Sequence, residues 1–373
     1  MTKNYFSFAA IVVLCAMVFV SCSKDYDFFD DDYFVSCNKG DDYSDDDYFE
    51  IDKPTITMMT AASEMRFSIL GSGEITIDWG DGTVEKRTLS GRWDKPTHSY
   101  SGTSVRTITI SGGNIETLFL GNHLSITLDA SSDSSLRSSN VTNNQLIYLN
   151  ISNYPALRHL SIEDSQLTSL DVSNNTALER LSVNNSQLTY LDVSNNTALI
   201  SLSIGNGSQL TYLDVSNNTA LVYLTVINNK LTDLNVSNNT ALEFLFVCGN
   251  QLTSLDVSNS TALSLLWASG NRLESLDVSN NTALEHLSVC MNQLTSLDVS
   301  NNVALRWLTM HHNQFTAPAL DALFKTLHSN ELPPHPTTTS PAKFVWIGGN
   351  PGAADSNRSI AIDRGWTVSD WNN

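Results

Sequence analysis

The stretch LTSLDVSNNTALERLSVNNSQ, residues 167–187, decides the fold, because eight copies of this pattern run from Leu146 to Gln314. The period is 21 residues and slips once. A fixed period of about 20 to 29 residues built on L-x-x-L-x-L is typical of a solenoid of stacked, parallel β coils. Stacked coils form long surfaces more readily than closed catalytic pockets, so the repeat favours binding over catalysis.

Each coil divides into a uniform half, such as LTSLDVSNNTA, and a variable half, such as LEFLFVCGNQ at residues 242–251. The leucines and the valine of both halves are expected to point into the coil, where stacking buries them at about 1.5 to 3 kcal/mol each. The pattern resembles leucine-rich repeat proteins of the internalin type, and most closely the DVSNNTAL repeats of Bacteroidetes surface proteins.

The resemblance implies that an asparagine closes the variable half and satisfies backbone groups in the turn. This position holds Asn229, Asn250, Asn271, Asn292 and Asn313. In the first coils it holds Ser165, Ser186 and Ser208, which predicts a looser ladder there.

The uniform half carries a column of carboxylates at Asp171, Asp192, Asp214, Asp256, Asp277 and Asp298, with Asn235 in the same register. Like charges about 5 Å apart repel unless each accepts local hydrogen bonds, as an Asx turn provides. Asn235 keeps the acceptor and lacks the charge. The column therefore indicates turn geometry, and a ladder of bound cations is the alternative.

The variable half, by resemblance, forms the parallel sheet of the concave face, and its outward positions become aromatic from Tyr223 onward. Contiguous exposed apolar side chains favour a recognition site for a macromolecule. We expect the ligand at Tyr223, Ile227, Phe244, Phe246, Leu265, Trp267, His286 and Trp307. Two alternatives remain: a loop or the C-terminal cap covers this patch, or inward and outward positions are exchanged.

Cysteines and histidines on the same face give a minor alternative, a zinc site made by Cys290, His286, His311 and His312. We expect neither a metal nor another cofactor. Cys248 and Cys290 are two coils apart, about 10 Å, which is beyond the reach of a disulfide.

The N-terminus predicts an exported lipoprotein. Residues 1–21 read as a signal peptide whose apolar run is too short to span a bilayer. The sequence FVSC at residues 19–22 resembles a lipobox, which implies lipidation of Cys22 and a membrane anchor. The following SKDYD resembles the export signal of surface lipoproteins in Bacteroidetes-type bacteria, which implies an outer-membrane protein exposed on the cell surface. The alternative is an ordinary secreted protein.

Residues 22–53 form an acidic segment that is expected to be a disordered tether, with twelve acidic and three basic residues between Lys24 and Lys53. The whole chain has a formal net charge of -19, which argues against binding to nucleic acid.

Strand-like alternation over residues 54–111 predicts a small β-sandwich. The sequence WGDGT at residues 79–83, with His98 and Tyr100, resembles PKD-like domains; Trp79 is expected in the core and Gly80-Asp81-Gly82 in a turn. The solenoid is predicted at 112–315, with degenerate coils at 112–145. An α/β cap over 316–373 is expected to cover the last coil.

Together these features predict a cell-surface lipoprotein, not an enzyme, that binds a protein partner through the concave face in adhesion or cell contact. A glycan-binding lipoprotein for nutrient capture is the first alternative. An envelope spacer is the second.

Overall fold

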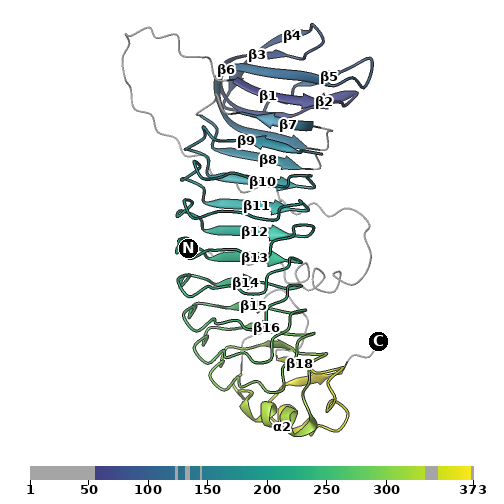
Figure 1. Cartoon of the computed structure of the whole chain (residues 1–373). Coiled ribbons are helices and arrows are strands. Elements are labelled where there is room, and N and C mark those ends of the chain that lie inside the picture. The colour runs from purple at the N-terminus through teal and green to yellow at the C-terminus, as the bar shows by residue number, and fades with distance from the viewer. Residues whose placement is uncertain (1–54, 122–124, 131–134, 143–144, 332–342, 371–373) are drawn as a thin grey trace, which may run out of the picture. The chain divides into compact units, whose positions relative to one another are not determined.

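The computed structural model describes residues 55–121, 125–130, 135–142, 145–331 and 343–370, all of which belong to one compact unit (Figure 1). The predicted signal peptide, Cys22 and the predicted tether lie outside the described residues. Within these ranges no helix is long and apolar enough to cross a membrane.

The N-terminal strands are mostly antiparallel, since β3 pairs with β4 and β6, and β1 pairs with β6 and β7. A separate two-stranded sheet joins β2 to β5. The bounds are β1 Thr55–Thr60, β2 Glu64–Arg66, β3 Ser68–Asp78, β4 Val84–Ser90, β5 Thr97–Ser99, β6 Arg106–Gly121 and β7 Ser125–Asp129.

Trp79 lies in the core of this region, as the sequence predicts, with 1% of its surface exposed. Its ring stacks on His98 at 4.9 Å, and the Tyr100 hydroxyl donates to the Trp79 carbonyl oxygen at 3.0 Å. Gly80 and Gly82 have φ values of 75° and 94°, so the predicted glycine turn is confirmed. Asp81 accepts from the Thr83 N–H and contacts His98 Nε2 at 2.8 Å. The residues of the WGDGT and H-x-Y sequences therefore stabilise the core and the turn of this region.

The expected boundary between residues 111 and 112 is wrong, because it falls inside β6. Gly112 and Gly113, with φ values of 83° and 67°, form an irregularity within the strand. The register of β6 with β3 shifts between Ser72 and Ile75 at the same place. Beyond it β6 pairs in parallel with β8, so the N-terminal strands and the coils share one sheet.

The coils form a ladder of short parallel strands (Figure 1). These strands are β8 Ser138–Thr142, β10 His159–Glu163, β11 Arg180–Asn184, β12 Ser201–Gly205, β13 Tyr223–Ile227, β14 Phe244–Phe246, β15 Leu265–Trp267, β16 His286–Ser288 and β17 Trp307–Thr309. Strand β9, Tyr148–Asn150, lies in the uniform half and pairs in parallel with β7. The period slips between β12 and β13, where Gly207 is the additional residue. Its φ of 91° shows that a glycine turn takes up the insertion.

The asparagine ladder of the variable half is confirmed. Asn271 Nδ2 donates to the carbonyl oxygen of Val247, one coil earlier, at 2.9 Å, and Asn271 Oδ1 accepts from the Leu252 N–H at 3.1 Å. The predicted loosening of the first coils also appears, because Ser186 and Ser208 bond only through their hydroxyls, 2.9 Å apart.

A second buried asparagine ladder, which the sequence analysis missed, runs through the uniform half. Asn196 Nδ2 donates to the carbonyl oxygens of Val172 and Asn175 at 2.9 and 2.8 Å. The same bonds recur at Asn175, Asn218, Asn239, Asn281 and Asn302. Both faces of the solenoid are thus tied from coil to coil by buried amides.

The aspartate column has the predicted turn geometry. Asp192 Oδ1 accepts from the Ser194 N–H at 2.9 Å, and Asn235 Oδ1 accepts from the Ser237 N–H at 3.0 Å. Hydrogen bonds from the serine two residues ahead lower the pKa of Asp171, Asp192, Asp214, Asp256 and Asp277. The Asn235 amide and the Asp192 carboxylate therefore accept the same turn hydrogen bond.

The C-terminal elements continue the ladder, because β18 pairs with β17 and β19 pairs with β18. They are α2 Ala317–Thr326, β18 Phe344–Trp346, α3 Ser359–Ile362 and β19 Thr367–Ser369. Asn350 extends the asparagine ladder, because its Oδ1 accepts from the Phe315 N–H at 3.2 Å and its Nδ2 donates to the Met310 carbonyl at 3.0 Å.

Candidate binding surface

The outward side chains of neighbouring strands stand in register. Strand pairing places Tyr223 beside Phe244, and Phe246 beside Trp267. The alternate positions are fully buried inside the coils, as expected, at Leu224, Leu245, Leu266, Leu287 and Leu308. The assignment of inward and outward positions is therefore correct, and the exchanged assignment is excluded.

The aromatic rings pack against each other along the ladder. Tyr223 and Phe244 are parallel, with 4.5 Å between ring centroids and an interplanar angle of 0°. Phe246 and Trp267 meet edge to face at 5.0 Å. Because strands are about 4.8 Å apart, side-by-side rings cover one another's faces. The Tyr223 and Phe244 rings therefore stand as a stacked pair.

Two of the eight expected ligand residues are less accessible than predicted. Trp267 is 7% exposed and His286 is 5% exposed, whereas Tyr223, Ile227, Phe244, Phe246, Leu265 and Trp307 are half-buried. Trp267 packs against Phe246, and His286 lies between Leu265 and Trp307 in the ladder. His286 is therefore enclosed by large neighbours on both sides, whereas Trp267 has Phe246 on one side and the small Ser288 on the other.

The sequence analysis missed two aromatic members of this face, Phe344 and Trp346 of β18. Strand β18 pairs with β17, so that Phe344 adjoins Trp307 and Trp346 adjoins Thr309. The rings of Trp307 and Phe344 are 5.0 Å apart, and Trp346 is 4.0 Å from His311. The sequence does contain a signal for these two residues. Phe-Val-Trp in β18 has the same alternation of outward and inward positions as Trp-Leu-Thr in β17. We define the aromatic surface as Tyr223, Ile227, Phe244, Phe246, Leu265, Trp267, Trp307, Phe344 and Trp346.

The aromatic surface is uncharged. From β13 to β18 the outward strand positions hold rings, aliphatic groups, hydroxyls and His286, with no Asp, Glu, Lys or Arg. The earlier coils differ, because β10 and β11 carry His159, Glu163 and Arg180 outward. Burial raises the pKa of Glu163 and lowers the pKa of His159. One concave sheet thus has a polar, charged part followed by an uncharged aromatic part.

The residues of the zinc alternative make other contacts. Cys290 Sγ lies 2.9 Å from Ser269 Oγ, and the Nδ1 atoms of His311 and His312 are 2.8 Å apart. Burial, followed by the neighbouring His312, lowers the pKa of His311 to about 4. Among the described residues no three metal-ligating side chains converge. Cys248 and Cys290 are not joined by a disulfide, as the sequence predicts.

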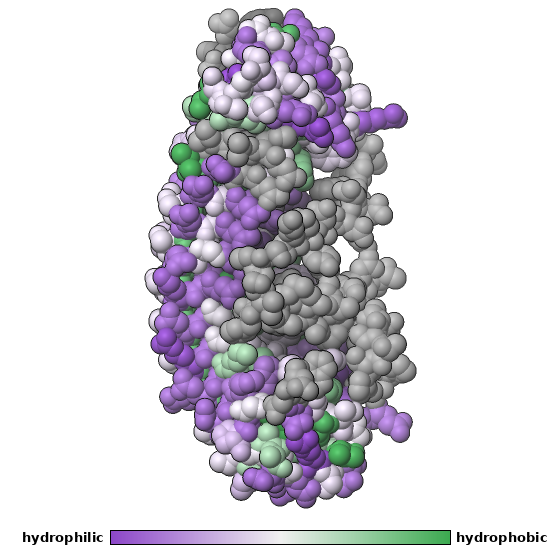
Figure 2. All heavy atoms as spheres, turned by 90° about the vertical axis from the view of Figure 1, so that its right-hand side faces the viewer, coloured by the Kyte–Doolittle hydropathy of each residue, from purple (hydrophilic) through white to green (hydrophobic). Residues whose placement is uncertain are grey.

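Figure 2 shows one face of the molecule, on which the described surface is mostly hydrophilic and several hydrophobic residues gather toward the C-terminal end.

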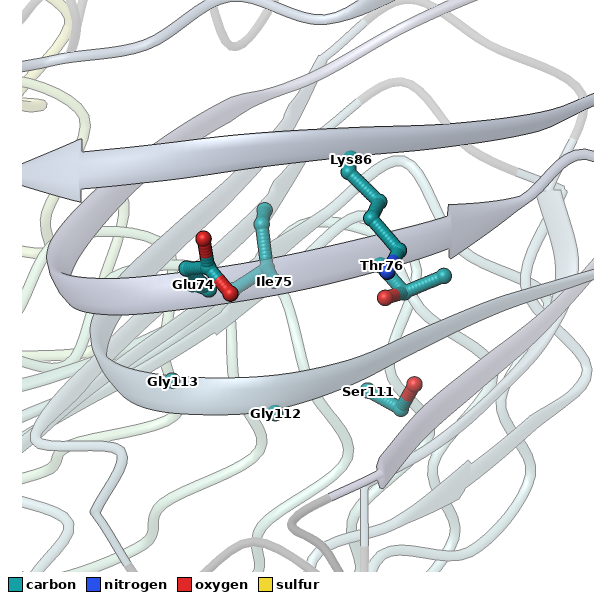
Figure 3. Close-up of a pocket in the computed structure, with 7 residues that line it drawn as sticks. All are labelled: Glu74, Ile75, Thr76, Lys86, Ser111, Gly112 and Gly113. Atoms are coloured by element: carbon teal, nitrogen blue, oxygen red, sulfur yellow. The ribbon is translucent and has the colours of Figure 1, made fainter.

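A separate open hollow of about 360 Å³ lies on the N-terminal strands (Figure 3). Its lining comes from β3, β4 and β6: Glu74, Ile75, Thr76, Lys86, Ser111, Gly112 and Gly113. A side chain at Gly113 would meet Ile75 Cγ2 at 2.7 Å, so the glycines shape this hollow through the irregularity of β6.

No protein-family model and no curated protein sequence matches the chain. Among solved structures it is similar to the functional domain of InlJ from Listeria monocytogenes, which includes a cysteine ladder, with 25% identity and a TM-score of 0.54. That match covers 66% of this chain and 66% of the InlJ chain. The internalin InlF of the same species matches at 21% identity and a TM-score of 0.51, over 69% of this chain and 87% of InlF. The repeat, the parallel ladder and these likenesses identify a leucine-rich repeat fold.

Proposed function

We propose that this protein binds a protein partner through the aromatic surface and acts in adhesion or cell contact, without catalysis. The observation that carries the proposal is the run of half-buried, uncharged aromatic side chains in register from β13 to β18. The cores of protein interfaces are depleted of charged residues and enriched in Tyr, Trp and Phe. The likeness to InlJ and InlF supports a binding role in place of an enzymatic one.

The ring geometry favours a protein over a glycan on this face. A sugar packs its apolar face flat on an open aromatic ring, but the Tyr223 and Phe244 rings turn their faces toward each other. Their edges, together with Ile227 and Leu265, suit apolar side chains of a partner, which pack from any direction.

The finer assignments belong to the same proposal. Residues 1–21 are a signal peptide, Cys22 carries the lipid, and 22–53 hold the domains away from an outer membrane on whose outer face the protein is displayed. The N-terminal strands are a PKD-like spacer, and residues 316–373 cap the solenoid. Labelling of intact cells with an antibody tests display. Labelling that appears only after permeabilisation would remove the adhesion role.

The binding proposal is tested with the chain from residue 23 onward and the double variant Phe244→Ser, Phe246→Ser. Captured surface proteins are identified by mass spectrometry, and the affinity of the purified partner is then measured. We expect the double variant to lose about 100-fold or more in affinity, as hot-spot rings do. Tyr212→Ser, in the uniform half, is the matched control and should bind normally. Equal binding by all three proteins would contradict the proposal, and a glycan array run in parallel tests the alternative.

A further inference from the structure

A second set of exposed rings lies outside the aromatic surface, in the uniform half of the early coils. Tyr148, Tyr190 and Tyr212 occupy the third position of this half, the x of L-T-x-L. They are 51%, 60% and 60% exposed. The leucines two residues before and one residue after each ring are buried. The tyrosines therefore lie outside the packed interior.

The fold does not require a ring at this position. The equivalent residues of the other coils are small and polar, at Ser169, Asp233, Ser254, Ser275 and Ser296, and these coils keep the same backbone bonds. An exposed tyrosine gains little from hydrophobic burial. In a half of the coil that otherwise varies little from copy to copy, three large exposed rings point to a ligand.

Backbone hydrogen bonds set the three tyrosines in one column. The N–H groups of Gln166, Gln187 and Gln209 donate to the carbonyl oxygens of Leu146, Leu167 and Leu188 at 2.7 to 2.9 Å, two residues before the column in each earlier coil. With about 5 Å per coil, Tyr190 lies about 5 Å from Tyr212 and about 10 Å from Tyr148. These distances are about one and two sugar residues along an extended polysaccharide.

Tyr190 and Tyr212 are also more exposed than the stacked rings of Tyr223 and Phe244. Each is 60% exposed, whereas Tyr223 and Phe244 are half-buried, so Tyr190 and Tyr212 offer more ring surface to a ligand. Exposed carboxylates flank them at Asp192 and Asp214, whose Oδ1 atoms accept from serine N–H groups. Each carboxylate also accepts a hydrogen bond from the serine side chain, and Asp214 accepts one from the Tyr212 side chain, which holds that ring beside the carboxylate. A carboxylate has about four acceptor positions, so each can still accept a hydrogen bond from a sugar hydroxyl.

We propose that Tyr148, Tyr190 and Tyr212 form a platform that binds a neutral polysaccharide chain lying along the coils. Tyrosine offers an apolar ring and a polar tip, which match the C–H face and the hydroxyls of a sugar. The adjacent aspartates repel anionic glycans and anionic lipid headgroups, so the ligand is neutral. This platform is separate from the aromatic surface and does not depend on the proposed protein partner.

The test is affinity gel electrophoresis of the chain from residue 23 onward in gels that contain soluble xylan, mixed-linkage β-glucan or glucomannan. The double variant Tyr190→Ser, Tyr212→Ser carries the residue of the neighbouring coils and should fold normally, as circular dichroism will check. We expect at least one polysaccharide to retard the unaltered chain, and the double variant to bind it about tenfold more weakly. Trp93→Ser, which removes an exposed ring of the N-terminal region outside both surfaces, is the matched control and should be retarded like the unaltered chain.

Absence of retardation by all three polysaccharides, or equal retardation of the double variant, would overturn the proposal. Sedimentation velocity tests whether the tyrosines instead mediate self-association of the chain. A dimer that dissociates in the double variant would assign the tyrosines to self-association and would also overturn it.

Discussion

At the residue scale, the aspartate column acts through one acceptor atom. Asp192→Ala removes the bond from the Ser194 N–H and should lower the free energy of unfolding by about 0.5 to 1 kcal/mol. Asp192→Asn keeps the acceptor, as Asn235 does naturally, and should be nearly neutral at pH 7. Denaturant unfolding of the two variants measures both effects. Equal losses in both would mean that charge, and not the acceptor, matters at this position.

The same aspartate gives a pH dependence with a definite sign. The hydrogen bonds from Ser194 lower the pKa of Asp192 in the folded chain below its ordinary value of 3.8, so the unfolded chain binds more protons. The stabilisation is complete above pH 3.8 and is lost as the pH falls through the lower, folded pKa. Asp192→Asn should therefore reduce the acid destabilisation that sets in as the pH falls below 3.8. Unfolding curves at several pH values check this.

Met291 is under backbone strain. Its φ is 55°, and the same turn position in the preceding coils holds Asn228, Gly249 and Gly270. A left-handed conformation costs an ordinary residue about 1 to 2 kcal/mol, and asparagine tolerates it better. Met291→Asn should raise the free energy of unfolding by about 0.5 to 1 kcal/mol. Met291→Ala is the control, since it shortens the side chain without relieving the strain, and a gain there would contradict the argument.

At the element scale, the coils are tied together by buried amides. Asn271→Ala would leave the buried Leu252 N–H without its acceptor and would remove one of the two amide bonds that the Val247 and Ala268 carbonyls each accept, at a cost of about 2 to 3 kcal/mol. Asn281→Ser is the matched control, because Ser260 fills that position naturally in the preceding coil and bonds the Asn239 carbonyl at 3.4 Å. It should cost less than half as much. Hydrogen exchange at Leu252 tests whether the loss is local.

The elements also show what the sequence could and could not predict. A strict period fixes the register, so the outward columns and the Leu266 and Leu287 interior were predictable. The burial of Trp267 was not, because it depends on the size and rotamer of Phe246 across the ladder. The two asparagines of each S-N-N look equivalent in sequence, yet only the second is buried.

Inserted residues explain why two other features, the neighbouring rings of Trp307 and Phe344 and the continuation of β6, were not predicted from the sequence. Phe344 follows Trp307 by 37 residues in the chain, not by 21, because α2 and the residues after it intervene, so the period does not reveal that the two rings are neighbours. The continuation of β6 through Gly112 and Gly113 was missed for a related reason. Two glycines usually mark a turn, but the paired strand β3 shifts its register to accommodate them.

At the scale of the whole molecule, each coil contacts mainly its two neighbours, so one complete coil should be removable. Deleting residues 252–272 joins Gln251 to Leu273 and takes out β15 with Leu265 and Trp267. The new neighbours, β14 and β16, have the same inward residues, Leu245 and Leu287, and the asparagine ladder can re-form. The shortened chain should unfold cooperatively, with a Tm within about 5 °C of the original.

Removal of a fraction of a coil should have the opposite result. Deleting only residues 252–266 shifts the pattern so that polar residues enter the interior, and this chain should be insoluble or unfolded. The complete-coil deletion should also lose the protein partner, because it removes the Phe246–Trp267 contact and shortens the aromatic surface, while polysaccharide binding at Tyr190 and Tyr212 should persist. Circular dichroism and the two binding assays separate these effects. If the complete-coil deletion unfolded like the partial one, the coils would not be the independent units that the ladder indicates.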